Sequence, residues 1–343
     1  MNPIINRLVQ HAVESIQIQV EDLDQRAATR LLTVHLEPVH FAMPIHSESV
    51  EARLMAWCRT EEDVAAATAF LRFEDTNTMT GIARVLARTH INRQGVANVR
   101  QGARWPVQSP RVVDLFSLAA DEEILRRWTD YHSLLESWLT LAHRYEGPDA
   151  GEDRCFGKSE IDCLEKLGSL TVGQARSLTA RQAAALCGNI GWARVVLGFY
   201  TGLLYLEDRF EFKAEKVWEA IDSAQTAAQV DALSWDAQRQ VREFGPRLAP
   251  SFFADLGSAN FVKADTHVTD VVSTALKLPG DAGDQQSIDF VRDLSQDVGW
   301  TPRAVDKLMY LACSGKFYLS GVELSKSQAL GRKRQLLESL RCV

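Results

Sequence analysis

The segment that most constrains the fold of this chain spans residues 235–272, where three short apolar runs with helical spacing are separated by helix breakers. The first run ends at Gly245, which precedes a proline, and the second, residues 247–256, stops at Gly257. A third helix is predicted to begin at Asp265, because aspartate is a preferred N-cap residue. A glycine ahead of a helix start lets backbone N–H groups approach an anion closely, and the helix N-terminus favours that anion. The segment therefore predicts a helical hairpin that can hold an anion such as a DNA phosphate.

The rest of the chain is also patterned like helices, with little of the alternation that is typical of strands. Residues 189–206 are apolar nearly all round, which predicts a buried central helix whose glycines let neighbouring helices pack closely. Helix starts with capping-box spacing occur at Thr171, Thr179 and Thr226. Thr301 is followed by a proline at the first helical position. We therefore expect an all-α fold.

The chain of 343 residues is long enough for two domains. Residues 146–158 form its clearest linker, because they are rich in glycine, proline and aspartate and lack periodicity. We therefore expect an N-terminal helical region, 1–150, and a second helical region, 151–343, with the alternative that the N-terminal helices complete the second one. The fold predicted is two helical subdomains with a central cleft.

Residues 244–249 (FGPRLA) and 263–268 (KADTHV) carry a resemblance to a known family. They resemble the helix-hairpin-helix DNA glycosylase superfamily, which includes endonuclease III and 8-oxoguanine glycosylase. Its pattern is a Gly-x-Gly hairpin with a lysine soon after, followed further along by Val-Asp-x-His. Gly245 matches the second hairpin glycine, and Asp265 and His267 match the Asp-x-His. The resemblance implies that the hairpin grips the DNA backbone and that the aspartate is catalytic.

Two positions depart from the family pattern. Glu243 stands where the first hairpin glycine is expected, and Arg247 stands where bifunctional members have their lysine nucleophile. An arginine stays protonated and cannot form a Schiff base. Lys263 is the nearest amine, and it is a candidate either for catalysis or for phosphate binding. The resemblance therefore implies a monofunctional enzyme that uses water as its nucleophile and has no lyase activity.

The chemistry that the resemblance implies is excision of a damaged or modified base from double-stranded DNA, which leaves an abasic site. The nucleotide is flipped out of the duplex, and its N-glycosidic bond breaks through a state with oxocarbenium character. Asp265 is the carboxylate that we expect to stabilise this positive charge and to position water. The sequence does not name the base. A specialist for modified bases, as in defence against phage DNA, is an alternative to an enzyme of general DNA repair.

Further candidate contacts with DNA lie outside these two motifs. Basic residues on a glycine-containing loop at 92–110 suit contact with a phosphate backbone. The complete set that we expect to bind DNA is Gly245, Arg247, Lys263, Arg93, Arg100 and Arg104. The aromatic candidates for a base pocket are Trp105, Trp192, Phe199 and Tyr200. The alternative for the loop is a solvated connector anchored by its tryptophan, and the alternative for the other aromatic residues is packing in the core.

Composition limits the partners and the cofactors. The formal net charge of −7 opposes non-specific binding to nucleic acid, so the basic residues must be concentrated on one face if DNA is the partner. No apolar run reaches the roughly 18 residues of a membrane span, and the N-terminus lacks a secretory signal, so we expect a cytoplasmic protein without a membrane partner. The cysteines and the histidines at 35, 40 and 46 match no metal-site spacing, so we expect no cofactor.

Two other classes of function fit the same sequence. Glu243 at the hairpin suits a non-catalytic helix-hairpin-helix DNA-binding protein, and the acidic balance suits a helical scaffold that binds a protein partner. Formation of abasic sites separates a glycosylase from the first class, and binding to DNA separates it from the second. We expect the glycosylase to act as a monomer.

Overall fold

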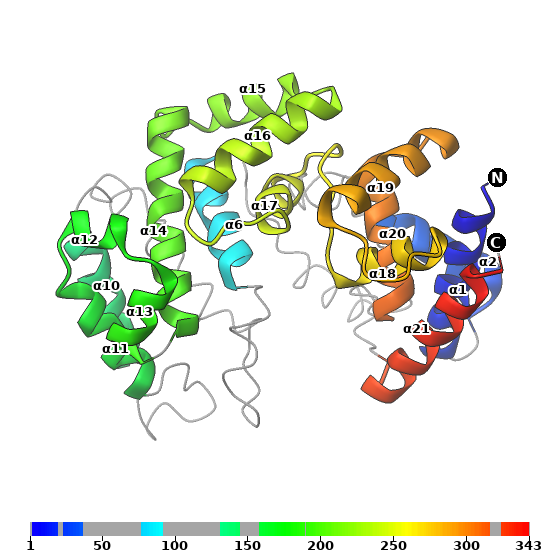
Figure 1. Cartoon of the computed structure of the whole chain (residues 1–343), viewed down its shortest axis with the longest axis horizontal. Helices are drawn as coiled ribbons and strands as arrows, with labels where there is room; N and C mark the ends of the chain where they lie inside the picture. Colours follow the sequence, from blue (N-terminus) through cyan, green and yellow to red (C-terminus); the bar gives the residue numbers. More distant parts are fainter. Residues whose placement is uncertain are drawn as a thin grey trace. The chain divides into compact units, whose positions relative to one another are not determined.

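The computed structural model describes residues 2–19, 23–36, 77–91, 131–144, 158–188, 190–315 and 324–342. Every regular element in these ranges is an α-helix, as Figure 1 shows. The all-α prediction is therefore confirmed for the part of the chain that the structure describes. None of the helices described there is long and apolar enough to span a membrane.

The chain divides into two compact units. The first unit consists of Met1–Phe73 and Phe253–Val343, and the second consists of Glu74–Phe252. The first unit therefore combines both ends of the chain. The boundary expected after residue 150 and the linker expected at 146–158 lie outside the described residues, except for Lys158, which begins a helix.

The helices of the first unit surround α20 (Pro302–Ser314), which packs against the five others described there. These are α1 (Pro3–Gln19), α2 (Gln25–Leu36), α18 (Thr266–Ala275), α19 (Asp284–Val298) and α21 (Lys326–Leu340). The face of α20 that carries Val305, Leu308, Met309 and Ala312 is buried. The helices from the two chain ends, α1 in blue and α21 in red, pack side by side in Figure 1.

The second unit is organised around α14 (Ile190–Phe210), which confirms the prediction of a buried central helix. Helices packed against α14 are α6 (Met79–Ile91), α11 (Lys158–Gly168), α12 (Val172–Ser177), α13 (Ala180–Cys187), α15 (Ala214–Ser223) and α16 (Ala227–Gln240). The remaining helix described within this unit, α10 (Tyr131–Arg144), packs on α11.

Glycines allow the close approach of α6 to α14 that the sequence predicts. A Cβ atom on Gly198 would lie 2.5 Å from the ring of His90, and one on Gly202 would lie 2.6 Å from the side chain of Leu86. Both distances are shorter than real contacts of Cβ atoms, so a side chain at either position would require the neighbouring residue to move.

The predicted helix starts are confirmed by the hydrogen bonds that cap these helices. Thr171 and Thr226 each form a complete capping box with the glutamine three residues later. The same pair of backbone hydrogen bonds joins Thr179 to Gln182. Thr301 caps α20, with proline at its first helical position. These caps satisfy backbone N–H groups that have no partner inside the helix.

The segment at residues 235–272 forms three consecutive helices, α16, α17 (Leu248–Leu256) and α18. The first helix ends at Gln240, four residues before the predicted end at Phe244, because Val241 leaves the helical conformation (φ −91°, ψ 121°). The boundary between the two units falls inside α17. The third helix begins directly after Asp265, as predicted.

Candidate functional site

Asp265 is the N-cap residue of α18 and belongs to the first unit. Its carboxylate atom Oδ1 accepts hydrogen bonds from the backbone N–H groups of His267 (2.8 Å) and Val268 (3.1 Å). Among the described residues no hydrogen bond is made to Oδ2, and Asp265 is only half-buried. The two bonds fix the carboxylate in place and leave one oxygen for a further partner.

A buried ion cluster holds the segment that leads into Asp265. The Asp306 carboxylate is 2% exposed and accepts a hydrogen bond from the backbone N–H of Lys263 (3.0 Å). The guanidinium of Arg303, itself buried, lies 2.9 Å from Asp306 and 2.9 Å from Asp255. Because a buried charge is stable only when it is paired and hydrogen-bonded, this cluster fixes the backbone two residues before Asp265.

Burial shifts the protonation of two groups in this cluster. Burial raises the pKa of Asp306. The positive charge of Arg303 lowers this pKa, and the negative charge of Asp265 raises it further. Burial, followed by the positive charge of Arg303, lowers the pKa of Lys307 to about 7, although part of that side chain is exposed. A lysine that is partly neutral near pH 7 has the properties of an acid–base group or a nucleophile.

The ring of His267 packs edge-to-face on Tyr310, with the ring centroids 5.4 Å apart. The Lys307 ammonium lies 5.5 Å from the centroid of the same tyrosine ring. This tyrosine therefore connects the start of α18 to the ion cluster on α20. His267 contributes to the site by packing and by the backbone N–H that it donates to Asp265.

The turn between α16 and α17 contains a residue in a strained conformation. Glu243 has a φ of 66°, in the left-handed region that glycine adopts without steric cost. Its carboxylate lies 3.6 Å from the Arg194 guanidinium. The Gly245 carbonyl accepts hydrogen bonds from the N–H groups of Leu248 and Ala249 and so begins α17, with open space where a Cβ would lie. These residues belong to the second unit.

Three aromatic residues predicted for a base pocket lie in the core of the second unit. Trp192, Phe199 and Tyr200 on α14 are 3%, 0% and 0% exposed. The ring of Phe199 packs 5.6 Å from that of Trp138, and the ring of Tyr200 packs 4.8 Å from that of Tyr131. These contacts match the core-packing alternative, and a base-binding role for the three residues stays a prediction.

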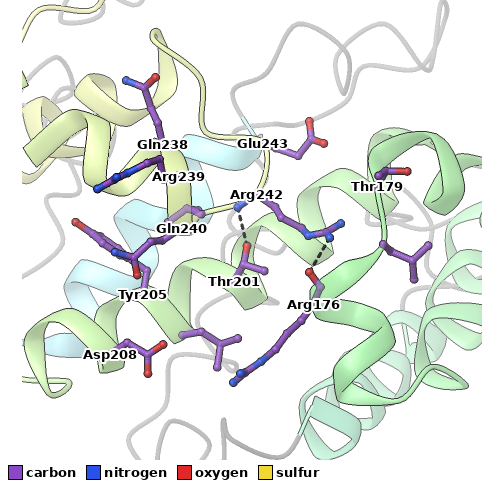
Figure 2. Close-up of a pocket in the computed structure, with 13 residues that line it drawn as sticks. Arg176, Thr179, Thr201, Tyr205, Asp208, Gln238, Arg239, Gln240, Arg242 and Glu243 are labelled. Carbon is purple, nitrogen blue, oxygen red and sulfur yellow. Dashed lines mark hydrogen bonds between the residues drawn. The ribbon is translucent and has the colours of Figure 1, made fainter.

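A pocket of about 610 Å³ lies in the second unit and is shown in Figure 2. Three segments line it: the end of α12 with the connection to α13, one face of α14, and the end of α16 with the turn that follows. Its lining includes Arg176, Arg239 and Arg242, but none of the aromatic residues predicted to bind a base. Its volume is within the range of small-molecule sites.

The two other basic residues predicted to contact DNA that the structure describes belong to different units. Arg247 is exposed and belongs to the second unit, and Lys263 is half-buried and belongs to the first. Arg93, Arg100, Arg104 and Trp105 lie outside the described residues, so the role of that loop stays a prediction.

The sequence interpretation did not identify the ion cluster on α20. Its members Arg303, Asp306 and Lys307 belong to a helix that was interpreted only from its apolar face. A cluster of charges in a helix is usually solvated, and the sequence carries no sign that α17 and the segment before α18 cover it. The pairing of Arg303 with Asp255, 48 residues earlier, is a tertiary contact that local spacing cannot predict.

No family model, curated protein or solved structure matches this chain.

Proposed function

We propose that the protein is a monofunctional DNA glycosylase that hydrolyses the N-glycosidic bond of a flipped, damaged or modified base in double-stranded DNA. The observation that carries the proposal is the order of elements: helix, short turn and helix, followed by a helix that Asp265 caps. The turn contains Gly245, and the cap is followed by His267, as the superfamily pattern requires.

The geometry of Asp265 supports its assignment as the catalytic carboxylate. A charge that stabilises an oxocarbenium-like state must be fixed before the reaction, because reorienting it would cost free energy in the transition state. The N–H groups of His267 and Val268 fix Oδ1, and the hydrogen bond from Lys263 to Asp306 fixes the preceding backbone. The second oxygen, Oδ2, is the atom that would face the sugar C1′ or the attacking water.

The backbone of the turn supports the hairpin assignment. The first glycine of the family pattern is replaced by Glu243, yet this residue has the left-handed conformation that a glycine adopts readily. The conformation is thus present although the residue type has changed. In the proposed complex the turn holds a DNA phosphate through its backbone N–H groups, and exposed Arg247 adds a positive charge.

The proposal is tested by replacing Asp265 with asparagine. Asparagine caps helices about as well as aspartate, so Asp265→Asn removes the charge while it keeps the cap. We expect base excision to fall by roughly a hundred- to ten-thousand-fold, the range for a positioned acid–base group. DNA binding should survive or become tighter, because a carboxylate that faces phosphates is lost. The measurement is alkali cleavage at abasic sites on duplexes that carry different damaged or modified bases.

A matched control is Asp281→Asn, which removes a charge from an exposed position in the same unit and should leave excision unchanged. Full activity in Asp265→Asn would contradict the mechanism and leave Asp265 only the cap role that it has in the fold. No excision of any base by the wild-type protein, together with DNA binding, would favour the non-catalytic alternative.

Trapping with borohydride tests the monofunctional part of the proposal. A reaction with water forms no Schiff base, so the wild-type protein should give no covalent adduct with DNA. Lys263→Ala and Lys307→Met identify the nucleophile if an adduct does form. Loss of that adduct in one of these variants would assign the amine and contradict the monofunctional mechanism.

A further inference from the structure

Two thiols lie together in the second unit, on helices that are neighbours in space but not consecutive in the chain. Cys163 belongs to α11 and Cys187 is the last residue of α13, and these two helices pack against each other (Figure 1). Both residues are buried, with exposed fractions of 0% and 4%, and both are thiols in this structure. The Cys163 thiol donates a hydrogen bond to the sulfur of Cys187. The two sulfur atoms are therefore already within hydrogen-bonding reach of each other.

A tyrosine on a third helix interacts with the same two thiols. Tyr131 of α10 is held by its hydroxyl, which donates to the Leu167 carbonyl of α11 (2.9 Å). Burial, followed by the interactions with Cys187, Tyr200 and Cys163, raises the pKa of this hydroxyl. Both sulfur atoms thus lie close enough to one hydroxyl group to act on it. This observation supports their juxtaposition independently of the hydrogen bond between them.

Cys187 is the thiol whose surroundings favour the thiolate. The hydrogen bond from Cys163 lowers the pKa of Cys187, burial opposes this effect, and the positive charge of Lys166 on α11 lowers the pKa further. The thiolate is the form of cysteine that reacts with peroxides, because it is the stronger nucleophile. A second thiol beside an oxidised cysteine can then close a disulfide. The geometry therefore gives Cys187 the attacking role and Cys163 the resolving role.

The end of α13 offers both access to Cys187 and room for the movement that a disulfide needs. This helix has eight residues, and the neighbours of Cys187 in the chain, Leu186 and Gly188, are exposed. Gly188 has a φ of 67°, and a Cβ atom there would meet no other atom within 4 Å. A disulfide requires the sulfur atoms to approach to about 2.05 Å. A helix end at the surface can make this approach without displacing the core, and it admits a molecule as small as hydrogen peroxide.

We propose that Cys163 and Cys187 form a peroxide-sensitive thiol pair, in which Cys187 is oxidised first and Cys163 then closes a disulfide between α11 and α13. The Cys187 thiolate attacks one oxygen of hydrogen peroxide, the O–O bond breaks, and a sulfenic acid and a hydroxide ion form. The sulfur of Cys163 then attacks the sulfur of Cys187, and the S–O bond breaks as hydroxide leaves.

The reaction balances with hydrogen peroxide as the oxidant. The two hydroxide ions take up the two thiol protons, so the pair gives up two electrons and two protons and the peroxide becomes two molecules of water. A dithiol such as dithiothreitol reverses the change by thiol–disulfide exchange. The pair lies in the second unit and uses neither Asp265 nor the ion cluster on α20. It is therefore independent of the proposed base excision.

The test is peptide mapping of the whole folded chain after treatment with hydrogen peroxide. The remaining thiols are blocked with N-ethylmaleimide, and the chain is then digested with trypsin, which cuts after lysine and arginine. The pair is contained in the tryptic peptides 159–166 and 182–194, each of which has one cysteine. Mass spectrometry should find these two peptides joined by a disulfide, and the joined species should disappear after dithiothreitol.

Two variants test the order of the steps. In Cys163→Ser the sulfenic acid at Cys187 has no thiol beside it to react with, so dimedone, which labels sulfenic acids, should mark peptide 182–194. In Cys187→Ser peptide 159–166 should keep its thiol under the same treatment. Absence of the dimedone label in a folded Cys163→Ser would contradict the attacking role of Cys187.

Two other cysteines of the same chain are internal controls. Cys342 is exposed and reports that peroxide has acted, whereas Cys313 is 2% exposed and burial raises its pKa to about 12, so it should stay a thiol. The proposal is overturned if peptides 159–166 and 182–194 remain separate when Cys342 is oxidised. It is equally overturned if Cys313 is oxidised as fast as the pair, which would show that oxidation follows unfolding. The mapping of the wild-type chain decides the question even if a serine variant fails to fold.

Discussion

His11 shows how a single buried residue makes the stability of the first unit depend on pH. It lies on α1, is 8% exposed, and its backbone carbonyl accepts a hydrogen bond from Arg332 (3.0 Å). Burial, followed by the positive charge of Arg332, lowers the pKa of His11 to about 4, against 6.5 when it is unperturbed. The unfolded chain therefore takes up a proton at a higher pH than the folded chain, so acid favours unfolding.

We expect the free energy of unfolding to fall as the pH decreases from about 6.5 to about 4, by at most about 3 kcal/mol from this residue. His11→Gln, which cannot take up a proton, should remove this part of the pH dependence and leave the stability above pH 7 similar. Urea unfolding at several pH values measures it. An identical pH dependence in the variant would show that His11 is not the group that titrates.

At the scale of helices, the contact between α6 and α14 is sensitive to the addition of a single methyl group. A Cβ on Gly198 would meet the His90 ring at 2.5 Å and the Arg242 carbonyl at 3.1 Å. Gly198→Ala should therefore destabilise the protein by about 1–2 kcal/mol, because overpacking costs more than the helix propensity gained. Gly331→Ala is the matched control, since its helix α21 has open space there, and it should stabilise by about 0.5–1 kcal/mol. Thermal melts measure both, and a stabilised Gly198→Ala would contradict the packing.

Helices and their caps could be predicted where they depend on residues that are close together in the sequence. The capping box of Thr226 with Gln229 and the N-cap at Asp265 depend on residues three positions apart or fewer, and both form as predicted. The composition of the apolar run alone was enough to predict the buried helix α14. The end of α16 was predicted too far along the chain, because the backbone already leaves the helical conformation at Val241. The turn that follows uses a left-handed Glu243, a conformation that glutamate rarely adopts and that the sequence does not reveal.

Features that depend on contacts distant in sequence were not predictable. The pocket combines Arg176 with Arg242, 66 residues later, and the pair Lys333–Asp270 joins α21 to α18. Such contacts follow from the packing of whole helices, which hydrophobic periodicity does not specify. For the same reason the sequence identified Asp265 but not Asp306, whose carboxylate holds the backbone at Lys263.

At the scale of the whole molecule, the net charge of −7 is the main physical objection to a DNA-binding function. Salt screens the long-range repulsion between an acidic protein and DNA, and this raises the affinity. Salt also weakens the contacts between basic residues and phosphates, because these contacts release counterions, and this lowers the affinity. The two effects therefore have opposite salt dependence. If binding is dominated by local contacts at Arg247 and Lys263, affinity should decrease with rising salt despite the acidic balance.

We predict that the affinity for double-stranded DNA falls with salt, with a slope that counts the phosphates contacted. Arg247→Glu should weaken binding to all sequences alike and reduce the slope by about one. The control Arg181→Glu makes the same change in net charge at an exposed position in the same unit and should have a smaller effect. Fluorescence anisotropy at several salt concentrations measures affinity and slope together. If Arg247→Glu and Arg181→Glu weakened binding equally, the loss would come from net charge alone, and the hairpin would have no specific role in holding DNA.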